Sequence, residues 1–128
     1  MVVDTSALIA ILSNEPERRA FNEKIAGAGG CFISAGSYLE TVIVIEARYG
    51  YDGVRDLAFF VQEAAMTVVP FDAQQVELAR RAYAEYGKGR HRAALNFGDC
   101  FAYALAKKRG EALLFKGEDF AQTDLEVA

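Results

Sequence analysis

The stretch NFGDCFAYALAKKRGEALLF, residues 96–115, has the signals of one complete helix–strand unit. Asn96 is a preferred N-cap residue, and Gly110 is the residue type that most often follows the last turn of a helix. The run between them is apolar enough for a helix packed on all sides, and the apolar run 112–115 has the length of a buried strand. The unit is typical of an α/β protein, so the carboxylate of Asp99 in this helix needs an explanation.

The same alternation of short strands and longer helices runs through the rest of the chain. Strands that alternate with helices of ten or more residues predict parallel βα units, with helices on both faces of the sheet. We therefore expect an α/β fold in a single domain, 1–128, with a central parallel sheet of four or five short strands. The expected strands are 1–3, 31–34, 66–69, 112–115 and a short one within 125–128. The expected helices are 7–13, 16–26, 37–50, 52–65, 73–86 and 97–109. We expect Thr5 or Ser6 to cap the first helix and Ser37 to begin the third.

The composition is that of one globular domain. Of 128 residues, 52% are hydrophobic and 25% are charged, so the chain can bury a core of its own. No apolar run approaches the roughly 18 residues that span a bilayer, and the N-terminus MVVDTS lacks the basic region of a signal peptide. We therefore expect a cytoplasmic protein with no membrane segment, in which Cys31 and Cys100 are reduced, buried thiols.

Several chemistries are disfavoured. His91 is the only histidine and the two cysteines do not cluster, which argues against a zinc site. The sequence contains no P-loop, no G-x-G-x-x-G and no G-x-S-x-G motif. A net charge of −4 argues against nonspecific binding of nucleic acid by the whole surface, although a local basic patch is compatible with it.

Acidic residues gather at one edge of the predicted sheet. Asp4 directly follows the first strand, Glu40 lies in the first turn of the helix after the second strand, and Asp99 begins the helix before the fourth strand. Glu118 and Asp119 follow that fourth strand. Because ligand sites of parallel α/β sheets lie beyond the carboxyl ends of the strands, we expect acids that are far apart in sequence to meet there.

Helix capping is an alternative explanation for most of these acids taken singly. Ser37 with Glu40, and Asn96 with Asp99, have the spacing of a capping box, in which a carboxylate is also favoured by the helix dipole. Asp72 precedes another helix with the same spacing to Gln75, and we interpret it as a cap only. Capping therefore accounts for single acids but does not explain why they converge.

Asp4 is the acid that capping explains least. A carboxylate buried without a partner costs several kcal/mol, and only Lys116 lies at a neighbouring strand end. Three or four converging carboxylates repel one another. A hard divalent ion such as Mg²⁺ or Mn²⁺ relieves that repulsion with the oxygen ligands it prefers, so we expect a divalent-cation site.

Four segments of the chain resemble the PIN-domain ribonucleases, and within them the toxin component of VapBC toxin–antitoxin pairs. The segments are VVDTSALIAIL (2–12), SAGSYLET (34–41), LNFGDCFAYALAKKRG (95–110) and LLFKGEDFAQTDL (113–125). The resemblance implies a PIN-like three-layer α/β/α fold. It also implies a Mg²⁺-dependent endoribonuclease that hydrolyses RNA phosphodiester bonds and leaves a 5′ phosphate, with Mn²⁺ able to substitute.

By motif, the resemblance assigns the catalytic and metal-binding acids to Asp4, Glu40, Asp99 and Asp119. Asp4 and Asp99 would be the primary ligands of an ion that activates a water molecule, and the sequence allows one ion or two. Glu118 could replace or assist its neighbour Asp119. Metal-binding acids are usually oriented by hydrogen bonds from neighbouring side chains, and the candidates here are Ser6, Asn96 and Thr123. Capping is an equally good local explanation for these three residues.

An acidic pocket that cuts RNA needs basic residues at its rim. The loop KGRHR, residues 88–92, lies shortly before Asp99 and has no apolar pattern of its own. A solvated loop is the alternative interpretation of such a charge run. The residues we expect to contact RNA are Lys88, Arg90, Arg92 and Lys116.

The resemblance implies protein partners as well. It implies a cognate VapB-type antitoxin that lies across the helices at 16–26 and 52–65 and reaches the acidic pocket, and a homodimer of the toxin.

A response-regulator receiver domain is one alternative class of protein. It gathers acids around Mg²⁺ and uses a lysine, for which Lys116 would serve, but the paired acids that it has after strand one are absent here. A catalytically silent binding module is another, although no motif acid is replaced here.

Overall fold

A computed structural model describes residues 1–128 as an α/β fold around one parallel sheet. The strand order is β3-β2-β1-β4, and every neighbouring pair is parallel. An isolated parallel bridge between Leu113 and Val127 extends the outer edge. The predicted sheet of four or five short strands is therefore confirmed. The strands are β1 (Val2–Val3), β2 (Phe32–Ser34), β3 (Thr67–Val69) and β4 (Leu113–Leu114).

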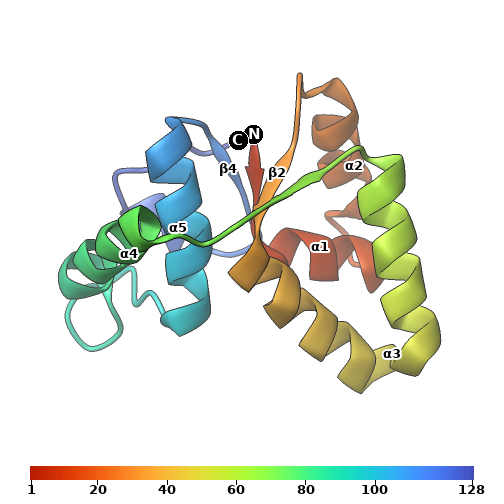
Figure 1. Ribbon diagram of the computed structural model, residues 1–128, viewed down its shortest axis with the longest axis horizontal. Helices are drawn as coiled ribbons and strands as arrows, with labels where there is room; N and C mark the ends of the chain where they lie inside the picture. The colour runs from red at the N-terminus through yellow and green to blue at the C-terminus, as the bar shows by residue number, and fades with distance from the viewer.

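Helices cover both faces of the sheet (Figure 1). One layer lies on the right of the view and the other on the left, so that the sheet is seen between them. Val3 packs in one core with the first layer, whereas its neighbour Val2 packs in a second core with the other, as alternating strand side chains must. The layers consist of α1 (Thr5–Leu12), α2 (Arg18–Gly27) and α3 (Ala35–Glu63) on one side, and α4 (Ala73–Tyr86) and α5 (Phe97–Arg109) on the other.

The start of α3 differs from the prediction. Ser34, the last residue of β2, is the N-cap, and its Oγ accepts a hydrogen bond from the Gly36 backbone N–H at 3.3 Å. Ser37 therefore lies inside the helix, its hydroxyl is buried without a partner, and the capping box with Glu40 is wrong. The expected break at Gly50 is a kink, with φ of 69°, between two segments of one long helix.

The start of α1 also differs from the prediction. Asp4, and not Thr5 or Ser6, caps this helix through a hydrogen bond from the Ser6 backbone N–H. β1 ends at Val3 and α1 begins at Thr5, so Asp4 is the one residue between them and occupies the cap position. Asp4 therefore has a structural role and a candidate functional role at once.

The predicted helix 97–109 is confirmed as α5. Asn96 caps α5, Asp99 completes the capping box, and Gly110 ends the helix in the left-handed conformation with φ of 65°. Asp72 caps α4 as predicted. Both cysteines are free and buried. None of the helices combines the length and the apolar character that crossing a bilayer requires.

Candidate functional site

The fold brings the four predicted acids together beyond the carboxyl ends of β1, β2 and β4. Burial, together with the negative charges of Asp4, Asp119 and Glu40, raises the pKa of Asp99 to about 7, against the opposing effect of a backbone hydrogen bond at Asn96. These residues come from four separate parts of the chain. The effect of the other three charges on Asp99 shows that all four acids lie near this carboxylate.

Asp4 is the most deeply buried of these acids, with 3% of its surface exposed. Burial is the main cause that raises its pKa to about 6, and the charge of Glu40 adds to it. Hydrogen bonds from the Ser6 hydroxyl at 2.6 Å and the Ser6 backbone N–H at 3.0 Å act in the opposite direction. Both of these bonds end on Oδ2, the Thr5 backbone N–H lowers the pKa as well, and no hydrogen bond ends on Oδ1.

Asp99 is held in a similar way. Its Oδ2 accepts a hydrogen bond from the Asn96 backbone N–H at 3.0 Å, and the Asn96 side chain accepts one from the Asp99 backbone N–H at 2.9 Å. The capping box therefore fixes the carboxylate and leaves Oδ1 free. Capping and a site role are compatible in this residue, because each uses a different oxygen.

No cation neutralises the four acids. Lys116, the only predicted partner of Asp4, directs its ammonium group to Glu15 at 3.1 Å and Glu17 at 3.0 Å. No ion pair of the protein includes Asp4, Glu40, Asp99 or Asp119. The site is thus a group of carboxylates held close together without positive charge.

One electrostatic observation favours Asp119 over its neighbour Glu118. The charge of Asp119 is one of the main causes that raise the pKa of Asp99, and it precedes that of Glu40. Both side chains are exposed, at the turn that leads into the 3₁₀ helix Phe120–Gln122. Asp119 therefore lies on the side of the site.

The three candidate orienting residues have different surroundings. Ser6 bonds directly to Asp4, and Asn96 bonds to Asp99 through its backbone N–H. Thr123 donates to the Phe120 carbonyl at 2.7 Å and has no hydrogen bond to any of the four acids. Thr123 stabilises the turn after Asp119 and does not contact the carboxylates.

Gly98 is a site residue that the sequence did not single out. A Cβ atom at this position would lie 2.1 Å from Oε2 of Glu40, so the bare backbone of α5 is what lets that carboxylate approach Asp99. Its signal in the sequence is a glycine directly before a motif acid, within the first turn of a helix where glycine has no conformational advantage. The close approach explains why glycine stands there.

The basic loop 87–95 connects α4 to the start of α5, close along the chain to Asp99. Lys88, Arg90 and Arg92 are all exposed. The base of the loop is closed by backbone hydrogen bonds from Lys88 to Leu95 and from Leu95 to Tyr86, each 2.9 Å. Inside it, Nδ1 of His91 accepts a hydrogen bond from the Ala93 backbone N–H at 3.0 Å, so that this histidine supports the loop.

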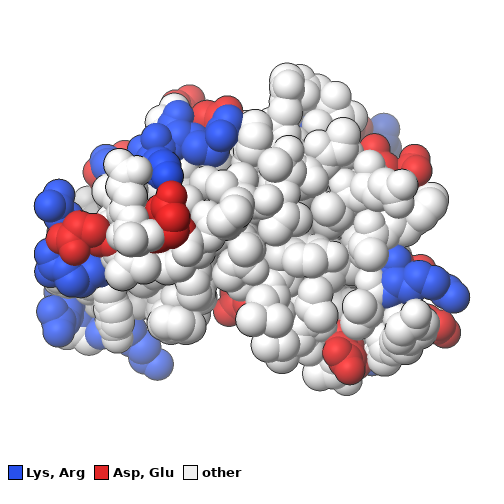
Figure 2. Space-filling model, in the orientation of Figure 1, with Lys and Arg blue, Asp and Glu red and all other residues white.

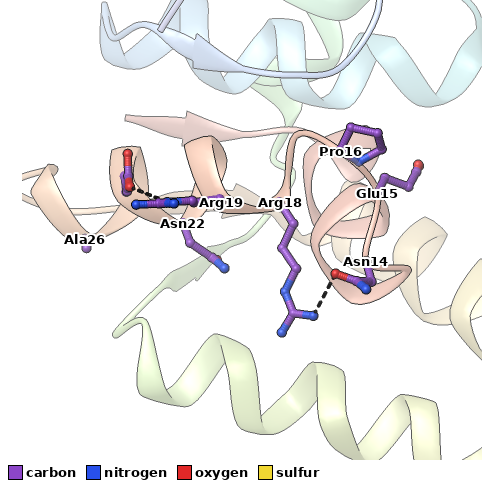
Figure 3. Close-up of a pocket in the computed structure, with 8 residues that line it drawn as sticks. Asn14, Glu15, Pro16, Arg18, Arg19, Asn22 and Ala26 are labelled. Carbon is purple, nitrogen blue, oxygen red and sulfur yellow. Dashed lines mark hydrogen bonds and ion pairs between the residues drawn. The ribbon is translucent and has the colours of Figure 1, made fainter.

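Apolar surface adjoins the acids. A groove of about 280 Å³ next to Glu40 is lined by Leu39, Ile43, Phe97 and Phe101, among others. Figure 2 shows an acidic side chain in the recess between the two halves of the molecule, and the middle of this face is free of charge. A polar depression of about 630 Å³, shown in Figure 3, lies instead along the start of α2 and contains none of the four acids.

The donor set fits a hard divalent cation that keeps part of its water shell. No three His, Cys, Asp or Glu side chains are close enough together to hold a metal ion by themselves. Mg²⁺ commonly takes only one or two carboxylates and completes its shell with water and substrate oxygens. The free oxygens of Asp4 and Asp99 in an uncompensated acidic site meet that requirement.

Comparisons with known proteins agree with this geometry. A family model described as PIN domain matches residues 1–126. Ribonuclease VapC30 of Mycobacterium tuberculosis is 53% identical over 125 residues, which cover 98% of this chain and 95% of that protein. Among solved structures, that of M. tuberculosis VapC20 matches this chain with a TM-score of 0.81 at 18% identity, covering 99% of this chain and 97% of that one. VapC20 is described as a toxin that cleaves the sarcin–ricin loop. A toxin–antitoxin complex from Klebsiella pneumoniae gives 0.76 at 19% identity, covering 99% and 95%.

Proposed function

This chain belongs to the PIN domain family and, within it, to the VapC ribonucleases, and we propose that it is a cytoplasmic, Mg²⁺-dependent endoribonuclease that acts as the toxin of a toxin–antitoxin pair. The observation that carries the proposal is the close group of Asp4, Glu40, Asp99 and Asp119 without any compensating cation. A structural role alone would favour ion pairs or fewer acids, because uncompensated charge at a buried site is destabilising.

Each acid has its own part in the proposed reaction. When bound, Mg²⁺ lowers the pKa of a water molecule and offsets negative charge on phosphate oxygens. Asp4 and Asp99 would hold the ion, while Ser6 and Asn96 keep these carboxylates in place through hydrogen bonds to Oδ2. Glu40, set against Gly98, and the exposed Asp119 complete the site and orient the attacking water. Mn²⁺, which shares the preference for oxygen ligands, substitutes for Mg²⁺.

RNA is the substrate in this proposal, and the loop 87–95 supplies its phosphate contacts. The exposed side chains of Lys88, Arg90 and Arg92 lie on the segment that leads directly into α5, where Asp99 stands. Phosphate contacts hold RNA near an acidic site that would otherwise repel it. Lys116 is also exposed, but its ammonium group is bound to two glutamates.

The purified protein should cut RNA in Mg²⁺ or Mn²⁺ and should not cut it in excess EDTA. In the proposed hydrolysis water adds to the phosphorus, the bond to the 3′ oxygen breaks and that oxygen leaves with a proton. The products should therefore carry a 5′ phosphate and ligate directly to an adapter that requires one. Sequencing of the adapter-ligated ends measures both the chemistry and the preferred site. Cleavage at full rate in EDTA, or products with a 5′ hydroxyl, would contradict the proposed chemistry.

An antitoxin of the VapB type is the proposed protein partner. A groove of about 350 Å³ lies between the end of α1, α2 and the second half of α3, and it is lined by Leu12, Phe59 and Phe60 together with polar residues. Phe59 is 63% exposed there. A related solved structure is a toxin–antitoxin complex. An amphipathic segment with apolar anchors would cover this groove and leave the polar residues at its rim.

A homodimer is the other proposed assembly. Leu39 and Ile43 of α3 are each 59% exposed, and Phe97 of α5 is 78% exposed. Phe97 separates the groove next to Glu40 from a second apolar groove of about 280 Å³ lined by Phe71, Val76 and Tyr83. Such a continuous apolar surface is typical of an interface, and a second copy of the chain is the proposed occupant.

Replacement of Phe97 by Glu should convert the dimer to a monomer, because the charge would be buried at the centre of the interface. Multi-angle light scattering after size exclusion measures the mass directly. Tyr51→Glu is the matched control, since Tyr51 is 79% exposed at the kink of α3, away from the two grooves. A Phe97→Glu protein with the same mass as the wild type would contradict this interface.

A further inference from the structure

Lys116 directs its ammonium group to two glutamates that are not among the four acids of the site. Its ammonium group lies 3.1 Å from Oε2 of Glu15 and 3.0 Å from Oε2 of Glu17. The three side chains are solvent-accessible, with 40% of Lys116, 27% of Glu15 and 33% of Glu17 exposed. Both glutamates belong to the connection between α1 and α2, which packs close to the end of β4 in this way.

The backbone of Lys116 is tied to the acidic site itself. Its N–H donates to Oγ of Ser6 at 3.0 Å, and the same hydroxyl donates to Oδ2 of Asp4 at 2.6 Å. One hydroxyl therefore separates the lysine backbone from the most buried carboxylate. Because the lysine stem has four flexible carbons, its ammonium group can reach the acids from this anchor as well as the two glutamates.

The neighbouring arginines leave Glu15 to the lysine. Figure 3 shows the guanidinium of Arg18 reaching toward Asn14, whose Oδ1 lies at 3.2 Å, while Glu15 points the other way. Arg19 pairs with Glu23 at 3.2 Å, one turn further along α2. Lys116 is thus the only cation bound to the two glutamates, although two arginines lie within three residues of Glu15 or Glu17 in sequence.

We propose that Glu15 and Glu17 are positioning residues that hold the Lys116 ammonium group out of the acidic site and so keep the site open to a divalent cation. An ammonium group among the carboxylates would relieve their repulsion and compete with the metal. The two glutamates offer it a stronger alternative at the surface. The inference rests on the proposed function, because it requires that the four acids bind a divalent cation.

The test is a titration of the metal-free protein with Mn²⁺ at about pH 7.5, followed by the loss of the electron paramagnetic resonance signal of free Mn²⁺. Four proteins are compared: wild type, Glu15→Gln/Glu17→Gln, Lys116→Ala and the triple variant. The double variant should bind Mn²⁺ about tenfold more weakly, because the freed lysine occupies the site. The triple variant should bind within about twofold of Lys116→Ala, because the competitor is gone.

The design separates the lysine from a general loss of negative charge. Removal of two negative charges weakens cation binding by long-range electrostatics whether or not Lys116 is present. If the two substitutions weaken Mn²⁺ binding equally in the wild type and in Lys116→Ala, the inference is overturned and the proposed function still stands. Unchanged binding in the double variant would overturn it as well. If the wild type binds no Mn²⁺ at a site sensitive to Asp4→Asn, both the inference and the proposed function fail. Thermal unfolding in EDTA checks the fold, and it should change little because exposed ion pairs contribute little to stability.

Discussion

Replacement of Asp99 by Asn, or of Asp4 by Asn, should reduce the initial rate of RNA cleavage by a factor on the order of 10³ while the protein stays folded. Asparagine keeps the size of the side chain and one oxygen, so the hydrogen bonds from Asn96 or Ser6 to that oxygen can be kept. It removes the negative charge that would hold Mg²⁺. The loss should therefore appear in activity and not in the far-ultraviolet circular dichroism spectrum.

Asp72→Asn is the matched control for this experiment. Asp72 is also an N-cap aspartate, and it pairs with Lys108 at 2.8 Å, but it lies outside the acidic site. Its replacement should leave the cleavage rate within about twofold, since asparagine caps helices as well as aspartate does. An Asp99→Asn protein that keeps more than about a tenth of the wild-type rate would show that this carboxylate is not a ligand of the reacting metal.

Stability should fall as the pH rises from about 5 to about 8 in the absence of metal. The folded-state pKa values of Asp4 and Asp99 are raised to about 6 and about 7, from an ordinary value of 3.8. The folded protein therefore keeps these protons at pH values where the unfolded chain has lost them, and the free energy of unfolding decreases through this window. Asp4 alone should account for a loss of about 1 kcal/mol between these two pH values.

Urea denaturation at the two pH values measures this effect. Asp4→Asn should reduce the dependence, leaving the part due to Asp99, and at the higher pH it should unfold at a higher urea concentration than the wild type. Added Mg²⁺ or Mn²⁺ should restore stability to the wild type at the higher pH and have much less effect on the variant. A wild type that gains stability from about pH 5 to about pH 8 in EDTA would show that the carboxylates are not raised in pKa.

Much of the architecture could be deduced from the sequence, because each strand and helix has its own local signals. The convergence of Asp4, Glu40 and Asp99 also followed from topology, since the carboxyl ends of parallel strands meet at one edge. The cap of α3 could not be deduced in this way, since the sequence predicted Ser37 and the cap is Ser34. Both are good cap residues, and only the pairing of Ser34 with Val69 in the sheet shows that the strand continues to the first of them.

The partners of single side chains were the least predictable part of the site. The sequence placed Lys116 at a strand end next to Asp4, but its ammonium group binds Glu15 and Glu17, from a connection whose position depends on how α1 and α2 pack. The contact of Gly98 with Glu40 likewise depends on the distance between two helices. Local sequence patterns report on capping and burial, and they carry no information about such distances.

The central claim is that the four acids form a site for a divalent cation. A crystal of the wild-type protein grown with Mn²⁺, with diffraction recorded at a wavelength where manganese scatters anomalously, locates the ion directly. The account predicts an anomalous peak in contact with carboxylate oxygens of both Asp4 and Asp99, on the side of Glu40 and Asp119. A map with no peak there, or with its strongest peak at Glu15 and Glu17, would contradict it.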